Sequence, residues 1–214
     1  VRHPHVVADP DVCRAGVRAR HLQRIGAMPQ SQLDTGHAAV NDLAGHVEPG
    51  EFRARQRAVV VVRVRLLVEV QALTATGFLG SAKRRTSGVD ANRLAMLIAV
   101  LEKRGGLRLA DQDVFVSAVG GMKIVEPAAD LAMALAITSA HYDRPMAAQC
   151  AAIGEVGLGG ELRGTQQIEL RLREAARLGF THLIAPPLPG SVHVPDRCDM
   201  ITARTISQAI ETLG

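Results

Sequence analysis

Lysine is the residue whose placement decides most about the chemistry available to this sequence. The chain has 25 basic residues, of which 22 are arginines, and its lysines are Lys83, Lys103 and Lys123. A phosphate-binding P-loop needs a lysine directly after a glycine and before a serine or threonine. None of the three lysines follows a glycine. The sequence therefore excludes a P-loop ATPase site within these 214 residues.

A glycine-rich run over residues 154–160 is the second feature that could bind phosphate. Its spacing departs from G-x-G-x-x-G, and the residues that follow it are typical of a strand rather than a helix. A dinucleotide-binding loop leads into a helix. We therefore interpret the run as a tight β-hairpin whose glycines supply positive φ angles.

Histidines and cysteines do not form a metal-binding pattern. Five of the eight histidines lie in residues 1–64, at spacings that match no ligand motif, and the three cysteines contain no C-x-x-C pair. We expect no metal site, and we expect free thiols in a reducing cytoplasm. No apolar run approaches the roughly 20 residues of a membrane span, and the first residues are not a secretory signal. We therefore expect a cytoplasmic protein with no membrane partner.

The cluster Lys83-Arg84-Arg85 could contact the phosphates of a nucleic acid. The alternative is that it belongs to a solvated loop, which is the common fate of short basic clusters. A net charge of +4 and a pI near 9.4 are weak signals, because an arginine-rich composition also follows from GC-rich coding.

The elements that must position these residues alternate between strands and helices from residue 66 onward. Leu94, Leu97, Ile98 and Leu101 form one apolar stripe on a helix that Asp90 could cap and that Gly105-Gly106 would end. Strands are expected over 58–62, 66–73, 114–119, 151–155 and 183–185, and helices over 90–104, 128–141, about 168–178 and 205–213. Residues 74–87 are expected to be a polar connector. The alternation predicts an α/β domain.

Residues 1–64 differ from the rest of the chain. They hold nine arginines and no lysine, and their apolar residues show no sustained periodicity. We expect most of this segment to be irregular or disordered. A further hypothesis is that it is an out-of-frame translation of a GC-rich gene, with the initial valine arising from a GTG codon.

Several stretches resemble one protein family in the same order. They include LLVEVQAL at 66–73, LIAVLEKR at 97–104, ADQDVFV at 110–116 and GEVGLGGE at 154–161. They are similar to the C-terminal domain of the bacterial DNA repair protein RadA (Sms) family. The resemblance implies a Lon-protease-like fold of the ribosomal protein S5 domain 2-like superfamily. It divides the chain into an unmatched segment 1–64, a Lon-like domain 65–190 and a C-terminal tail 191–214 with a final helix.

Lon proteases use a serine nucleophile and a lysine base. By the resemblance, Ala128 occupies the nucleophile position, and the base falls near Glu169, with no lysine after Lys123. Without a hydroxyl and an amine this mechanism has neither of its reacting groups. The resemblance therefore implies a domain with the Lon fold and no catalytic residues.

The family consists of ring-forming ATP-dependent motors that act on branched recombination intermediates together with a RecA-type recombinase. The family's ATP, magnesium and zinc sites belong to regions that this sequence lacks, so we expect no cofactor here. We expect a scaffold domain that assembles into a ring, such as a hexamer, and contacts DNA. The candidate contacts are Lys83, Arg84, Arg85 and Arg108.

Two alternatives stay open at this point. One is a Lon-like peptidase or a small-molecule kinase of the same superfamily, which would use the glycine-rich hairpin. The other is a structural relic with no DNA role, since residues 65–214 carry 16 basic and 15 acidic residues.

Overall fold

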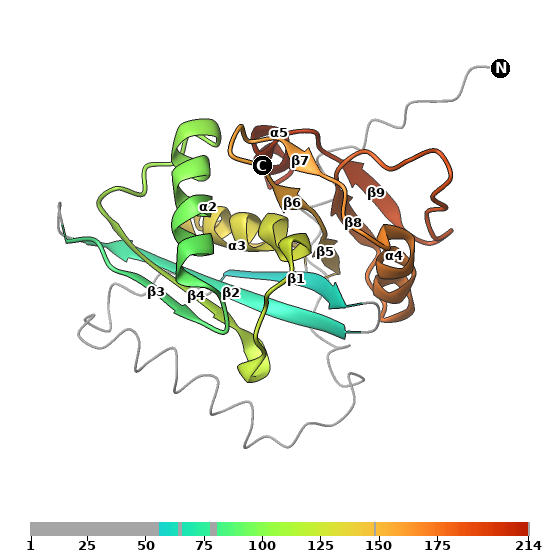
Figure 1. Ribbon diagram of the computed structural model, residues 1–214, viewed down its shortest axis with the longest axis horizontal. Coiled ribbons are helices and arrows are strands. Elements are labelled where there is room, and N and C mark those ends of the chain that lie inside the picture. Colours follow the sequence, from blue (N-terminus) through green and yellow to red (C-terminus); the bar gives the residue numbers. More distant parts are fainter. Residues whose placement is uncertain (1–55, 64–65, 78–80, 148, 214) are drawn as a thin grey trace.

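The strands of the computed structural model form a mixed seven-stranded sheet in the order β3-β4-β2-β1-β5-β8-β9 (Figure 1). The structure describes residues 56–63, 66–77, 81–147 and 149–213. The seven strands are β1 (Gln56–Arg63), β2 (Leu66–Thr76), β3 (Arg84–Ser87), β4 (Gln112–Ala118), β5 (Cys150–Ala152), β8 (His182–Ala185) and β9 (Asp199–Thr202). A separate two-stranded hairpin consists of β6 (Glu155–Val156) and β7 (Leu162–Arg163). The predicted α/β class is confirmed.

The two halves of the sheet are built differently. β2 pairs antiparallel with both β1 and β4, and β3 adds to β4 in parallel. The other half is parallel, because β5 pairs with β1, β8 with β5 and β9 with β8. The helices are α2 (Ala91–Arg104), α3 (Asp130–Tyr142), α4 (Ile168–Arg177) and α5 (Ile206–Glu211), with short 3-10 turns η3 (Val119–Gly121) and η4 (Pro127–Ala129). No helix among the described residues is both long and apolar enough to cross a membrane.

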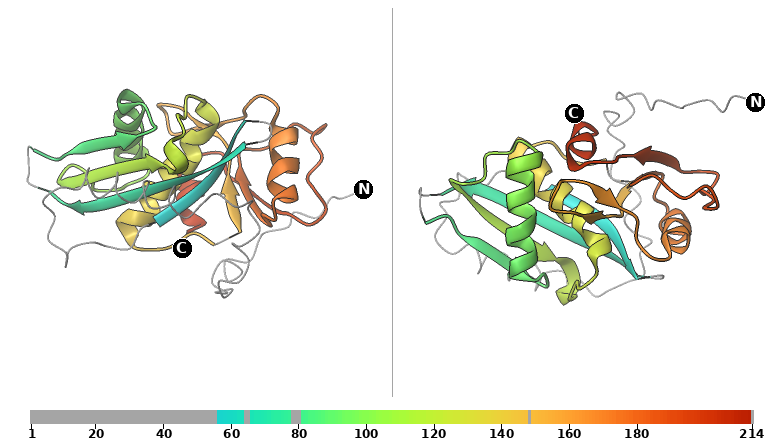
Figure 2. Two further views of the ribbon diagram at one scale, coloured as in Figure 1. Left: turned by 90° about the horizontal axis from the view of Figure 1, so that it is seen from below. Right: turned by 45° about the horizontal axis from the view of Figure 1, so that its top comes forward.

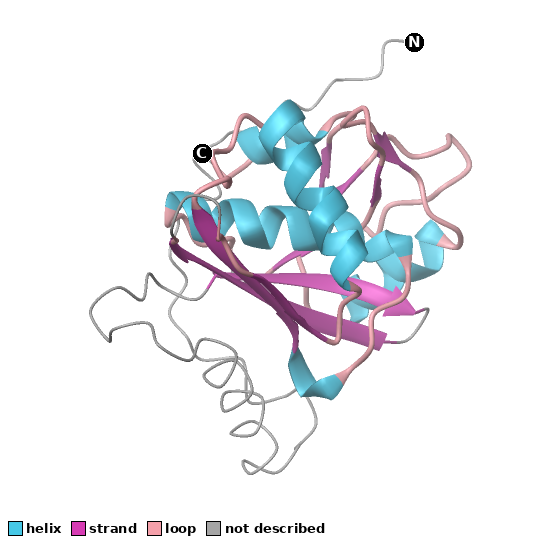
Figure 3. Cartoon of the chain, turned by 60° about the vertical axis from the view of Figure 1, so that its left-hand side comes forward, coloured by secondary structure: helices cyan, strands magenta, loops and turns pink. Residues whose placement is uncertain are grey.

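Helix α2 follows the sequence pattern closely. The Asp90 side chain accepts a hydrogen bond from the Arg93 backbone N–H at 2.9 Å, which satisfies one free donor of the first turn. The stripe that begins at Leu94 is buried, and Gly105 ends the helix. The buried side of α2 packs on α3 and on the β3 edge of the sheet, and the other side of the helix is exposed (Figure 3).

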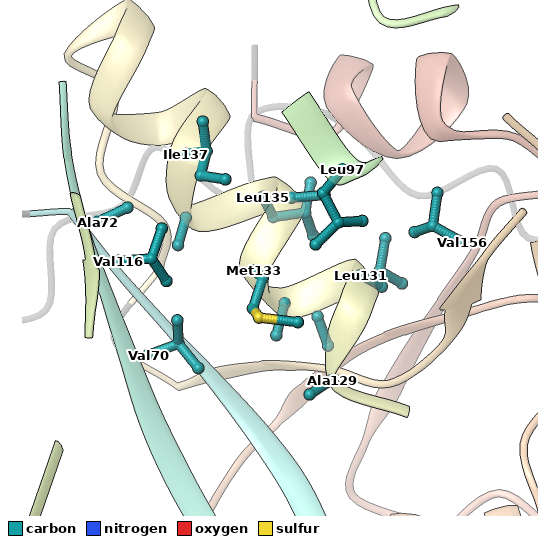
Figure 4. Close-up of a cluster of buried hydrophobic side chains, with 14 of the residues drawn as sticks. Val70, Ala72, Leu97, Val116, Ala129, Leu131, Met133, Leu135, Ile137 and Val156 are labelled. Carbon is teal, nitrogen blue, oxygen red and sulfur yellow. The ribbon is translucent and has the colours of Figure 1, made fainter. Parts of the chain in front are cut away.

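Helix α3 is the centre of the fold. Every residue from Asp130 to Ala140 is buried, and the many alanines of the helix let neighbouring elements approach closely. Its larger side chains lie between sheet residues such as Val70 and Leu97 of α2 (Figure 4). Burying one leucine, isoleucine or methionine contributes about 1.5–3 kcal/mol, so α3 supplies much of the stability of the domain.

A second apolar cluster lies across the parallel half of the sheet. Along β5, Cys150 and Ala152 face the α3 cluster, whereas Ala151 faces Ile168 and Leu172 of α4, as expected for the two-residue period of a strand. The α3 cluster and α4 therefore lie on opposite faces of the sheet at β5. Figure 2 also shows that α2 and α4 lie toward different ends of the sheet. The turn η4, directly before α3, lies between the two clusters, because Ala128 belongs to the second cluster and Ala129 to the first.

The sheet extends beyond both ends expected for the domain. The strand expected over 58–62 is present as β1, and it lies between β2 and β5, so the expected boundary at 64/65 falls inside the β1–β2 hairpin. The expected tail 191–214 supplies β9 and α5, whose Ile206 and Ala209 are part of the main core. The remaining expected extension, residues 1–55, lies outside the described residues.

The polar connector expected over 74–87 was a wrong prediction. β2 continues to Thr76, and residues 84–87 form β3, the edge strand beside β4. Two arginines in a four-residue strand hid it from the sequence pattern, because charged residues are unusual in strands except at edges, where they block further pairing.

Candidate functional site

Ala128, at the expected nucleophile position, is part of the second apolar cluster. It lies in η4, is 2% exposed, and packs among buried residues of β5, β8 and α4. The other buried members of that cluster are Ala151, Ile153, Ile168, Leu172, Ala175 and Leu183. The expected nucleophile position therefore belongs to a cluster of buried apolar side chains.

Glu169, at the expected base position, faces solvent on α4. Its carboxylate accepts a hydrogen bond from Arg173 one turn later at 2.5 Å, which makes an i,i+4 pair on the helix. The Glu169 carboxylate is therefore engaged by an arginine of its own helix. The structure brings α4 against η4 but joins no nucleophile to a base there.

A buried ion pair lies on the inner side of α4. Arg171 is 7% exposed at its side chain, and its guanidinium donates to Glu126 at 2.5 Å and to the Gln166 carbonyl at 3.1 Å. The pair links α4 to the loop that leads into η4. Each charge compensates the other, so the pair holds the two segments together without offering a free charge.

A second buried pair was not expected from the sequence. Asp130 is fully buried at the start of α3, and both of its carboxylate oxygens accept hydrogen bonds from Arg93 of α2, the Nη2 contact being 2.6 Å. The backbone N–H of Val156 in β6 donates to the same carboxylate at 3.3 Å. Asp130 therefore ties α2, α3 and the glycine-rich hairpin to one point.

The protonation of this pair follows from burial. Desolvation raises the pKa of the Asp130 carboxyl, and the hydrogen bonds from Arg93 oppose that shift. The hydrogen bond to Asp130 raises the pKa of Arg93. The signal in the sequence was a lone carboxyl in an otherwise apolar helix, since a buried charge needs a partner.

The glycine-rich run is a hairpin, as we interpreted it. β6 and β7 pair antiparallel, and Gly160 has φ near +84°, which an alanine would adopt only with strain. The Glu161 carboxylate lies over the turn, where its own backbone N–H and then Arg163 hold its pKa below the usual range. The turn is therefore filled by a side chain of the protein itself.

The candidate DNA contacts converge on one corner of the molecule, which we call the β3 corner (Lys83, Arg84, Arg85 and Arg108). The Arg84 guanidinium donates to the Leu109 carbonyl at 2.7 Å and to the Gln112 carbonyl, so β3 is fastened to the loop that carries Arg108. Lys83, Arg85 and Arg108 are exposed. Arg84 thus positions the corner, and the other three side chains remain open to solvent.

In the described part of the chain, no three His, Cys, Asp or Glu side chains lie close enough together to hold a metal ion. The histidines of residues 1–64 that the sequence analysis considered lie outside the described residues. Among the described residues, Cys150 and Cys198 form no disulfide bond, and burial raises the pKa of Cys198.

The first comparison with known proteins is a family model that matches part of the chain. The family described as subunit ChlI of Mg-chelatase matches residues 99–188, which run from the second half of α2 to the loop after β8. The match therefore covers the whole Glu126–Arg171 pair, Asp130 of the other buried pair and the whole glycine-rich hairpin.

The relatives are more specific. DNA repair protein RadA of Streptococcus pyogenes serotype M6 is 43% identical over 150 residues, that of Streptococcus pneumoniae is 45% identical over 148, and that of Escherichia coli is 42% identical over 145. These alignments cover 68–69% of this chain and 32–35% of each relative. The resemblance to RadA is confirmed: the chain is a RadA homologue over about two thirds of its length, and it spans about a third of the length of these relatives.

Proposed function

We propose that this chain is a non-catalytic Lon-like scaffold that contacts DNA in DNA repair and recombination. The observation that carries the first part is the environment of Ala128, where the expected nucleophile position is occupied by apolar packing. The names of the relatives support the second part, since all three are DNA repair proteins. The β3 corner supplies exposed cations for phosphate contacts.

The Lon-like assignment belongs to this proposal. The order of elements supports it: η4 leads directly into the buried helix α3, and the β6–β7 hairpin follows β5. A peptidase or kinase of the same superfamily is disfavoured by the paired state of the nearby charges, because Glu126, Glu169 and Asp130 all bind arginines.

Ring assembly, a RecA-type recombinase as partner, a cytoplasmic location and the absence of a cofactor are the remaining parts of the proposal. They follow from the resemblance to RadA. Rings arise when one surface of a subunit binds a different surface of the next, so a ring-forming chain needs two complementary faces. The sheet has two edge strands, β3 and β9, at its opposite ends.

Two measurements on the purified whole chain test the proposal. Light scattering should give the mass of a ring-shaped oligomer, and assays with casein and with ATP should show no hydrolysis above the buffer rate. Casein or ATP turnover that persists through repeated purification contradicts the non-catalytic assignment. A monomer without affinity for DNA supports a structural relic instead.

A further inference from the structure

Most arginines in the second half of the described chain are bound by carboxylates. Arg163, Arg171, Arg173 and Arg177 bind Glu161, Glu126, Glu169 and Glu174, respectively. Lys103, Arg104 and Arg204 are different, because they are exposed and no carboxylate of the described residues lies within ion-pair distance of them. Their charges are therefore available to an external anion.

The glycine-rich hairpin brings these cations together from distant parts of the sequence. A Cβ placed on Gly160 would lie 2.7 Å from the Cβ of Arg104, so the hairpin packs directly on the last residue of α2. On its other side, the Leu162 backbone N–H donates to the Arg204 carbonyl at 2.8 Å, and the Gly160 carbonyl accepts from Ile206 at 2.8 Å. The end of α2 and the start of α5 thus lie on either side of the hairpin (Figure 1).

This group of cations continues into the β3 corner. Arg108 follows Arg104 by four residues, in the loop between α2 and β4. Glu102 of α2 accepts from the Leu109 backbone N–H at 3.2 Å, and Arg84 of β3 donates to the carbonyl of the same residue at 2.7 Å. Hydrogen bonds therefore connect the edge strand, the loop and the end of α2 without a break.

We propose that Lys103, Arg104 and Arg204 form a phosphate-binding surface, here called the α2-end surface, which extends the β3 corner into one continuous contact for the backbone of duplex DNA. The inference rests on the proposed DNA-contacting function and adds a site to it. The carboxylates beside the surface are already engaged, since Glu102 binds the backbone of Leu109 and Glu161 binds Arg163.

The composition of the surface favours duplex backbone over single strands. Sequence-independent binding of single strands relies on bases stacked on aromatic side chains. Neither the α2-end surface nor the β3 corner contains an aromatic residue; the phenylalanines and tyrosine of the described chain are Phe115, Tyr142 and Phe180. Arginine and lysine alone bind phosphates and hold a duplex in place without reading its sequence.

Fluorescence anisotropy with a labelled random-sequence duplex, measured against salt, tests this assignment on the whole chain. The test variant is the double substitution Arg104→Gln and Arg204→Gln. The matched control is Arg173→Gln with Arg177→Gln, which removes the same charge from two carboxylate-bound arginines of α4. Each lost phosphate contact lowers the slope of log Kd against log salt by about 1, so the test variant should lose about 2 and the control should match the parent.

The possible results distinguish a failure of the α2-end surface from a failure of the proposed DNA-contacting function. If the parent binds duplex but the test variant keeps the parental slope, the α2-end surface is wrong while the DNA-contacting function stands. If the parent does not bind duplex at 50 mM salt, the proposed function fails, and the inference fails with it. Tighter binding of a single strand of the same sequence than of the duplex overturns the choice of duplex. Unchanged circular dichroism and melting temperature verify that the exposed substitutions leave the fold intact.

Discussion

The arginines of α4 and the cations at the end of α2 carry the same charge in opposite circumstances. Arg171, Arg173 and Arg177 each bind a carboxylate, and Arg171 is buried. Arg104, Arg108 and Arg204 are exposed and have no such partner among the described residues. The number of basic residues is therefore a poor guide to nucleic-acid binding, because a charge neutralised within the protein cannot attract phosphate.

The largest effect is expected from the buried pair that ties α2 and the glycine-rich hairpin to α3. Replacing Asp130 by Ala leaves Arg93 without its partner and removes the contact to Val156, so we expect a loss of about 3 kcal/mol in the free energy of unfolding, as for other broken buried pairs. Urea denaturation measures it. The double variant Arg93→Met with Asp130→Leu should recover most of the loss. A single variant as stable as the parent contradicts the structural role of the pair.

A smaller effect is expected at Ala128. Substitution by Ser places a hydroxyl among apolar side chains, which should cost about 1–2 kcal/mol without a hydrogen-bond partner. The same variant should remain inactive on casein, because restoring the nucleophile does not supply a base. Denaturation and a proteolysis assay check both parts, and measurable casein cleavage by the variant would show that a base is present after all.

We predict opposite effects on stability and DNA binding for substitutions of the neighbouring residues Arg84 and Arg85. Substituting Arg84 by Gln removes its bonds to two carbonyls, so the unfolding free energy should fall by about 1 kcal/mol while the salt dependence of DNA binding is unchanged. Arg85→Gln should reverse the pattern, with unchanged stability and a slope smaller by about 1. The distinction between positioning and contacting residues breaks down if both variants alter the slope equally.

The smallest effect is expected on the outer face of α4. Removing Arg173 breaks an exposed intrahelical pair, which is worth about 0.3–0.5 kcal/mol. Its substitution by Gln should shift the urea midpoint barely beyond error and leave DNA binding unaltered. A tenfold loss of DNA affinity in this variant would contradict the claim that the carboxylate-bound arginines of α4 do not contact DNA.

Much of the fold could be predicted from local pattern. The stripe on α2, the capping by Asp90 and the alanine content of α3 each specify an element through the sequence alone, and the structure has all three. The glycine-rich hairpin was also predictable, because its spacing excludes the phosphate-binding loops and its glycines suit a turn.

The elements that escaped prediction are edge strands and long-range partners. β3 and β9 are four residues long and half exposed, so neither shows the apolar run that reveals a buried strand. The pairing of Asp130 with Arg93 joins residues 37 apart, and the contact of Arg104 with Gly160 joins residues from different halves of the chain. Such contacts depend on topology, which local periodicity does not encode.

In the candidate site, too, residue identities could be predicted from the sequence but their spatial contacts could not. The sequence named Ala128, Glu169 and the members of the β3 corner, because residue identity alone shows what chemistry is missing and where charges cluster. It did not separate Arg84, which binds backbone carbonyls, from Arg85, which is exposed. That separation depends on which way each side chain of a strand points, and the strand itself had not been expected.

The most direct test of the central claim is the salt dependence of duplex binding by the whole chain and by a variant with Lys83, Arg85 and Arg108 all replaced by Gln. The account predicts that the parent binds a random duplex with log Kd rising linearly with log salt, and that the slope falls by about 3 in the variant. Identical slopes for parent and variant, or no binding by the parent at 50 mM salt, would contradict it.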